Sequence, residues 1–263
     1  MAALRYYTTI LTLSSGSAFL VFMLNRYLPS RNARNLTRAT HGHETSAAVA
    51  ILNPQKQDLF QHRITMEIPT TRLKPGLDNN EILARFTQGF FGGWIFSPER
   101  WVVLLLTDVP SETPGFDNVN LEESPIREVW DLEALSAKAP PPSGSLLFGN
   151  FLLAESVSNA TTRRETEQPP AKPGPQGPRD FASAEFVAGG SKTFELISSH
   201  RFEVAREHDR EEKGGRDLVT VTFSHVSCKS VAGRPYSTFF RLLHLVYARL
   251  LFANGIRAIL ETK

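Results

Sequence analysis

The sequence has little of the chemistry that would by itself identify a function. Cys228 is the single cysteine among 263 residues, so an internal disulfide and a zinc site built from several cysteines are both excluded. A chain without disulfides favours the cytosol, the mitochondrial matrix or a membrane face in contact with either. The sequence also lacks a Gly-x-Ser-x-Gly elbow, a Walker sequence and a Gly-x-Gly-x-x-Gly after a strand. Hydrolase, nucleotide and dinucleotide functions therefore have no motif to support them.

The chain also has no large excess of either basic or acidic residues. The chain has 29 basic and 27 acidic residues, a formal net charge of +2. A nucleic-acid-binding protein usually carries a basic stripe or a strongly positive domain, so we do not expect nucleic acid as a partner. Hydrophobic residues make up 41% of the chain, which is enough for a folded core.

Charged residues are missing between Arg5 and Arg26. About 20 residues of helix span a hydrocarbon core of about 30 Å, so we predict an N-terminal transmembrane anchor over residues 1–27. Basic residues are more frequent after this segment than before it, which predicts a single-pass protein with its domain facing the cytosol. No Asp or Glu precedes Glu44, so a mitochondrial targeting segment stays open as an alternative, and a cleaved secretory signal is a weaker one.

Composition divides the remaining chain into a tether and one domain. Residues 28–57 have mixed polarity and no clean period, and we interpret them as a tether. The domain covers residues 58–263. Within it, residues 158–180 contain five prolines and few apolar side chains, which predicts a disordered insertion.

Periodicity within the domain predicts an α+β fold. Apolar or bulky side chains alternate from Phe60 to Ile68, as in a half-buried strand. Asp78 suits the N-cap of a helix over about residues 79–90, and Ser97-Pro98 begins a second helix. Loops join the later strands, which favours antiparallel pairing. The later elements are strands over residues 126–132, 146–155, 181–187, 193–204 and 218–228, and a long helix over residues 237–260.

This element order resembles the helix-grip fold of START and polyketide-cyclase-like proteins over about residues 58–260. The resemblance implies a curved antiparallel sheet that grips the long C-terminal helix and encloses a cavity. The segment from Phe86 to Trp101 is similar to uncharacterised filamentous-fungal membrane-anchored proteins, and it implies no activity.

Two histidines are the candidate catalytic residues. Strand alternation places His200 on the predominantly apolar face of residues 193–204, and His225 on the corresponding face of residues 218–228. An inward histidine can act as a general base, a proton shuttle or a hydrogen-bond donor, or it can simply satisfy a backbone carbonyl in the core. His62 on the first strand is a weaker candidate. The predicted ligand-binding residues on the same two strands are Phe194, Leu196, Phe202, Val221 and Phe223.

Two further candidates have less support. His41 and His43 form a His-x-His pair, but in the predicted tether. Cys228 lies three positions after His225 and therefore on the opposite strand face, which disfavours a nucleophile–base pair. We expect neither a cofactor nor a metal.

The sequence thus predicts a membrane-tethered domain that binds a hydrophobic small molecule such as a lipid, polyketide or terpenoid. One alternative is a cofactor-free cyclase or isomerase of secondary metabolism, with His200 or His225 transferring the proton. A second alternative is a non-catalytic accessory protein of a membrane complex.

Overall fold

The computed structural model describes residues 30–54, 56–106, 127–158, 180–189, 196–207, 217–229 and 237–261, and it has an α+β fold. The strands are β1 (Arg34–Leu36), β2 (Phe60–Pro69), β3 (Arg127–Val129), β4 (Ser145–Leu147), β5 (Phe151–Ser158), β6 (Asp180–Gly189), β7 (Leu196–Glu207) and β8 (Leu218–Lys229). The helices are α2 (His41–Glu44), α3 (Ala47–Leu52), α4 (Asn79–Gly92), α5 (Ser97–Leu106) and α6 (Thr238–Leu260), with 3₁₀ turns at Thr70–Arg72 and Leu132–Ala134. The predicted anchor over residues 1–27 and nearly all of the predicted insertion lie outside the described residues.

The eight strands of the described residues form one sheet in the order β1-β2-β8-β7-β6-β5-β4-β3. Every pair is antiparallel except β3 with β4. The first long strand, β2, therefore lies beside the last, β8, although the rest of the sheet separates them in sequence. The predicted α+β class and C-terminal helix are confirmed, whereas the sheet is mixed, because β3 pairs with β4 in parallel.

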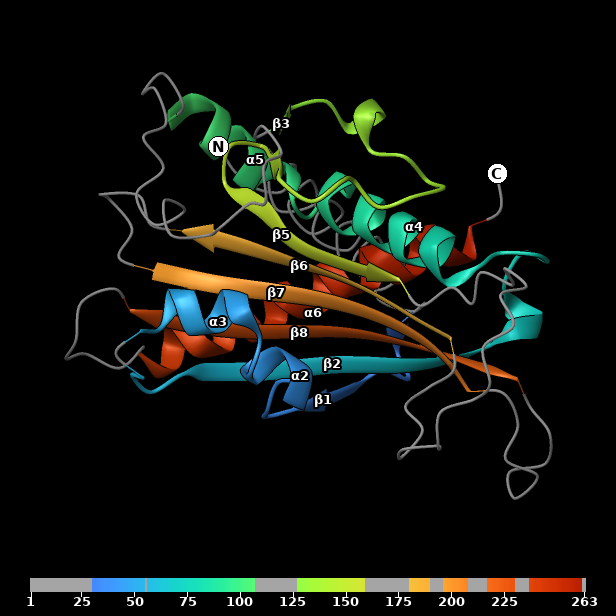
Figure 1. Ribbon diagram of the computed structural model, residues 1–263, viewed down its shortest axis with the longest axis horizontal. Helices are drawn as coiled ribbons and strands as arrows, with labels where there is room; N and C mark the ends of the chain where they lie inside the picture. The colour runs from blue at the N-terminus through green and yellow to red at the C-terminus, as the bar shows by residue number, and fades with distance from the viewer. Residues whose placement is uncertain are drawn as a thin grey trace, which may run out of the picture.

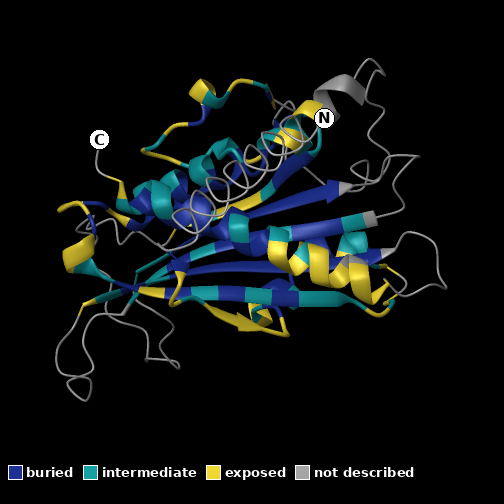
Figure 2. Ribbon diagram, turned by 180° about the vertical axis from the view of Figure 1, so that it is seen from behind, coloured by how far each residue is buried: buried dark blue, intermediate teal, exposed yellow. Residues whose placement is uncertain are grey.

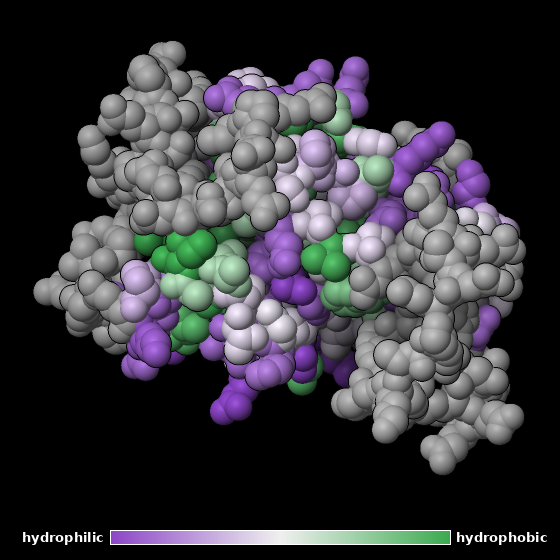
Figure 3. Space-filling view, viewed as in Figure 1, coloured by the Kyte–Doolittle hydropathy of each residue, from purple (hydrophilic) through white to green (hydrophobic). Residues whose placement is uncertain are grey.

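Helices cover both faces of the sheet (Figure 1). α4 packs against α6 and against β6 and β7, while α2 and α3 pack on the other face against β8 and β7. On the face with α2 and α3, polar and apolar side chains both reach the surface (Figure 3). The buried residues concentrate on the sheet and on the inner sides of α4 and α6 (Figure 2).

The core between α4, α6 and the sheet contains a network of contacting phenylalanine rings among aliphatic side chains. Phe86 and Phe90 of α4 both contact Phe202 of β7, with ring centroids 5.1 and 4.8 Å apart. Phe86 also meets Phe252 of α6 edge-on at 5.4 Å. Such tilted and edge-on pairs stabilise the core beyond simple burial. α4 begins as the sequence predicts, because Asp78 and Glu81 form a capping box.

Two parts of the chain differ from the sequence prediction. The predicted tether over residues 28–57 contains β1, which pairs with β2, and the short helices α2 and α3 on the sheet. The predicted strand over residues 146–155 is divided into β4 and β5 by a tight turn, in which Phe148 and Gly149 have φ angles of 52° and 67°. Such positive φ angles are incompatible with a continuous strand.

Candidate functional site

Four histidines meet on the face of the sheet that α4 and α6 cover. His62 of β2 lies directly opposite His225 of β8, and His200 of β7 lies opposite the same His225 from the other side. Three neighbouring strands thus present three imidazoles in one row across the sheet. α6 adds His244 above this row.

The rings of this histidine cluster (His62, His200, His225 and His244) are in direct contact. Nε2 of His62 lies 3.0 Å from Nε2 of His244. The centroid of the His225 ring lies 4.3 Å from that of His244, 5.1 Å from that of His62 and 4.8 Å from that of His200. One ring nitrogen from each of His62, His225 and His244 lies within 4.8 Å of the other two.

Burial keeps the whole cluster neutral at physiological pH. His62 and His225 are only 3% and 2% exposed. Loss of solvent lowers the pKa of His62 and of His200 to about 3, that of His244 to about 4 and that of His225 well below its usual value. The neighbouring histidines reinforce the shift for His62, His200 and His225, because like charges repel. Neutral imidazoles can accept a proton or bind a metal ion.

Three ring nitrogens of the cluster lack a hydrogen-bond partner among the described residues. In the part of the chain that the structure describes, Nδ1 of His62, His200 and His225 is buried without a hydrogen bond. An unsatisfied buried polar group costs about 1–3 kcal/mol, and native proteins contain few of them. The cluster therefore has unused donor or acceptor capacity in the interior.

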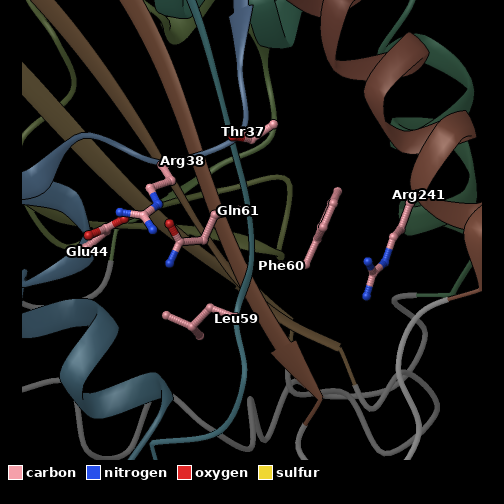
Figure 4. Close-up of a pocket in the computed structure, with 7 residues that line it drawn as sticks. All are labelled: Thr37, Arg38, Glu44, Leu59, Phe60, Gln61 and Arg241. Carbon is pink, nitrogen blue, oxygen red and sulfur yellow. The ribbon is translucent and has the colours of Figure 1, made fainter.

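Phe60 separates the cluster from an open pocket at the start of β2. Its ring lies 5.9, 6.0 and 5.6 Å from those of His62, His225 and His244. Figure 4 shows Phe60 on the side of β2 that faces Arg241 of α6, and the guanidinium of Arg241 lies 5.6 Å from the Phe60 ring. The pocket has a volume of about 590 Å³ and is lined by Thr37, Arg38, Glu44, Leu59, Phe60, Gln61 and Arg241.

The first half of α6 is apolar on its outer side. Its exposed hydrophobic residues are Phe239, Leu242, Leu243, Leu245 and Val246. Figure 2 shows this exposed half in yellow, continuing into the buried second half of the helix. Among the described residues, α6 is the one helix long and apolar enough to cross a membrane, over Arg241–Leu260, and half of that span is buried inside the protein.

A second buried polar cluster lies on the opposite face of the sheet. Nδ1 of His43 lies 2.9 Å from Oγ of Ser224, and its Nε2 lies 2.8 Å from Oγ of Ser199. Ser199 and Ser46 donate hydrogen bonds to Glu185 at 2.8 and 2.7 Å. The resemblance to a Ser-His-acid triad is incomplete, because both ring nitrogens of His43 contact hydroxyls.

The charged partner of Glu185 is Arg201 rather than His43. Nη1 of Arg201 lies 3.2 Å from Oε2 of Glu185, whereas Nε2 of His43 lies 3.7 Å from Oε1. Burial, helped by the charge of Arg201, lowers the pKa of His43 to about 3, so its ring is neutral. Since His43 is completely buried, we assign this cluster the role of attaching α2 and α3 to the sheet.

The structure brings the predicted catalytic residues His200 and His225 together and adds His62, the weaker candidate. The sequence analysis missed His244, whose signal is a lone histidine within an otherwise apolar stretch of α6. His41 is exposed and His43 buried, so this pair shares no site. Cys228 is buried on the face opposite to His225, with its Sγ 3.6 Å from the carbonyl oxygen of Leu52.

The predicted ligand-binding residues belong largely to the packed core. Phe202, Val221 and Phe223 are at most 1% exposed, and Phe202 and Phe223 contact each other and Phe90. Phe194 and the side chain of Leu196 lie outside the described residues. No known protein family, curated protein sequence or solved structure matches the chain.

Proposed function

We propose that this protein is a membrane-tethered domain that binds an apolar small molecule, such as a lipid, polyketide or terpenoid, beneath the first half of α6. One observation carries the proposal. The segment that exposes Leu242, Leu243 and Val246 also directs His244 inward onto the buried histidine cluster. A molecule that partitions into a bilayer would thus meet an apolar entrance with neutral polar groups behind it, the usual composition of a small-molecule site.

The attachment of the chain near Ser30 supports a membrane-facing orientation of α6. Arg249 of α6 donates hydrogen bonds to the carbonyl oxygens of Ser30 at 2.8 Å and Ala33 at 2.9 Å. The predicted anchor ends three residues before Ser30, a reach of about 10 Å for an extended chain. Ten helical residues, about 15 Å, separate Arg249 from Phe239. The exposed apolar half of α6 therefore lies within reach of the bilayer that would hold the anchor.

The topology supports the proposal that this α+β domain has a helix-grip fold. β2 precedes the helices α4 and α5, the strands β3 to β8 follow, and α6 ends the domain with β2 beside β8. Because phenylalanine rings fill the space under α4, the ligand would lie between the first half of α6 and the β2–β8 pair. Phe60, in contact with both the open pocket and the cluster, would be its first aromatic contact.

The second candidate function is a cofactor-free cyclase or isomerase. The unsatisfied Nδ1 atoms of His200 and His225 favour it, since a neutral imidazole held beside a ligand can remove and return a proton. In that case His225, at the centre of the row, would be the base that acts on the ligand.

The decisive experiment uses the full chain, purified from its source in lipid nanodiscs and extracted with organic solvent for mass spectrometry. We expect a stoichiometric apolar compound in addition to bulk lipid. The double variant Leu242→Glu/Val246→Glu should lose it, whereas Leu36→Glu, which changes an exposed leucine of β1, should retain it. Equal recovery from all three proteins, or no compound from any, would contradict the proposal.

A separate experiment tests the alternative that the protein is an enzyme. His200→Ala and His225→Ala should stop formation of the product in the source organism while the extracted compound stays bound. Unchanged metabolites in both variants would leave binding alone as the function.

A further inference from the structure

Three of the four clustered histidines lie close enough together to hold one metal ion. His62, His225 and His244 each place a ring nitrogen within 4.8 Å of the other two, and Nε2 of His62 lies 3.0 Å from Nε2 of His244. Nitrogens bound to one tetrahedral Zn²⁺ at about 2.0–2.1 Å are about 3.3–3.4 Å from one another. Small rotations of these side chains would therefore bring all three nitrogens to one ion.

We propose that His62, His225 and His244 bind one divalent transition-metal ion, with Zn²⁺ the best match. Imidazole ligands suit Zn, Cu, Fe and Ni. Three protein ligands with a fourth position left for water or a ligand are typical of catalytic zinc, whereas structural zinc sites use four protein ligands. The proposal departs from the sequence analysis, which expects no metal.

The elements that carry the three ligands would hold the site in place. β2 and β8 pair along ten residues, and His62 and His225 face each other across that pair. α6 is fixed at its buried second half, where Phe252 packs against Phe86 of α4. Ligands on strands and helices are positioned more precisely than ligands on loops.

The unsatisfied nitrogens give an independent reason to infer a ligand. Phenylalanine packs throughout this core, so aromatic packing alone does not require histidine at these positions. Nδ1 of His62 and of His225 is nonetheless buried without a hydrogen-bond partner among the described residues. The protein around these rings therefore does not fully satisfy them, and coordination of an ion by the cluster would offset part of the cost of burying polar rings among phenylalanines.

His200 is excluded from the proposed ligand set by its position. It contacts His225 with ring centroids 4.8 Å apart, but it stacks on Phe223 at 5.9 Å and meets Phe151 edge-on at 5.6 Å. We assign it a supporting place beside the ligand His225. The metal site does not rest on the proposed apolar ligand or on membrane attachment, because all its residues belong to the folded domain.

The test measures metal on the full chain, purified in detergent without a polyhistidine tag. We expect elemental analysis to find about one zinc per chain, and the chelated protein to bind Co²⁺ with the visible absorption of a tetrahedral site. His244→Phe keeps an aromatic ring at a partly exposed position of α6 but removes a ligand. It should weaken Zn²⁺ binding by more than the roughly 10–100-fold that is lost when a residue supporting a ligand is removed. His244→Gln repeats the measurement if the first variant does not fold.

Two further variants make the assignment specific. His41→Phe, at an exposed position of α2, should bind Zn²⁺ as the unaltered chain does. His200→Phe should weaken binding by no more than the roughly 10–100-fold lost when a residue behind the ligands is changed, and by less than His244→Phe does. The inference is overturned if the unaltered chain carries no metal and takes up neither Zn²⁺ nor Co²⁺, or if His41→Phe or His200→Phe loses as much affinity as His244→Phe. Retention of the metal by His244→Phe would overturn it equally.

Discussion

Nε2 of His62 lies 3.0 Å from Nε2 of His244, although 182 positions separate the two residues in sequence. His62 is on the first long strand and His244 on the last helix, so their contact forms only when the chain has closed into one domain. The strand pair β2–β8 brings His225 to the same place. The candidate site is therefore a product of topology and not of any local motif.

Gly255 of α6 and Phe86 of α4 set the distance between the two helices. A Cβ atom added at Gly255 would lie 2.5 Å from Cε2 of Phe86, whose ring is fully buried. Gly255→Ala should therefore destabilise the protein by about 1–3 kcal/mol through overpacking, despite a gain of about 1 kcal/mol in helix propensity.

The control for this prediction is Gly42→Ala on α2, where nothing lies within 4 Å of an added Cβ. Its free energy of unfolding should stay within about 0.5 kcal/mol of the unaltered chain. Urea unfolding followed by circular dichroism measures both variants. Equal stability of the two would contradict the close packing of α4 on α6.

His43 should make the protein less stable in acid. Its folded pKa is lowered to about 3 from an ordinary 6.5, so between these values the unfolded chain binds a proton that the folded chain does not. The free energy of unfolding then decreases as the pH falls from about 6.5 towards 3, by up to about 1.4 kcal/mol per pH unit for this residue.

Glu185 acts in the opposite direction, so the measurement is a comparison of variants. Burial raises the pKa of Glu185 above its ordinary 4.5, so the folded protein is less stable at neutral pH, where this carboxylate is charged. The free energy of unfolding therefore increases as the pH falls from the folded-state pKa of Glu185 towards 4.5. His43→Gln removes only the histidine titration. The stability advantage of the unaltered chain over this variant should shrink by about 2–3 kcal/mol between pH 7 and pH 4.5. A constant difference across that range would show that folding does not lower the pKa of His43.

Residues 30–57 should be needed for folding. They supply β1, which pairs with β2, and His43 and Ser46, which contact Ser224, Ser199 and Glu185 in the interior. Without them the buried carboxylate of Glu185 loses a hydrogen bond, which costs about 1–3 kcal/mol or more for a charged group, and the edge of β2 is open to aggregation.

Two truncations separate this role from that of a tether. A chain that begins at Ser30 should unfold cooperatively on heating, whereas a chain that begins at Asp58 should aggregate or lack a thermal transition. Identical cooperative unfolding of both would restore the interpretation of residues 28–57 as a tether.

Arg249 should hold the start of the domain against α6. It is buried, and its guanidinium also donates to Oδ1 of Asn35 at 3.2 Å. Arg249→Met keeps the apolar stem but removes the hydrogen bonds to Asn35 and to the carbonyl oxygens of Ser30 and Ala33. It should lower the free energy of unfolding by about 2 kcal/mol or more, because these oxygens lose a charged donor. Limited proteolysis should then cut earlier within residues 30–36. Arg241→Met, an exposed change on the same helix, should leave the cleavage pattern unchanged.

The sequence by itself determined the elements of this protein where side-chain periodicity is long and regular. Alternation over residues 60–68 and 218–228 fixed which side chains share a strand face, and Asp78 with Glu81 marked the start of α4. It did not determine the turn at Phe148, because a phenylalanine with positive φ has no local signal. The helices α2 and α3 were also missed, since helices of four and six residues are too short for a period and depend on tertiary packing.

Only the tertiary structure decided the composition of the site. Alternation predicted that His62, His200 and His225 point inward, but the antiparallel register makes them direct neighbours, and register depends on long-range pairing. His244 joins them because the close approach of α4 and α6 fixes where α6 lies. Burial then lowers the pKa of all four rings, and that burial exists only in the assembled core.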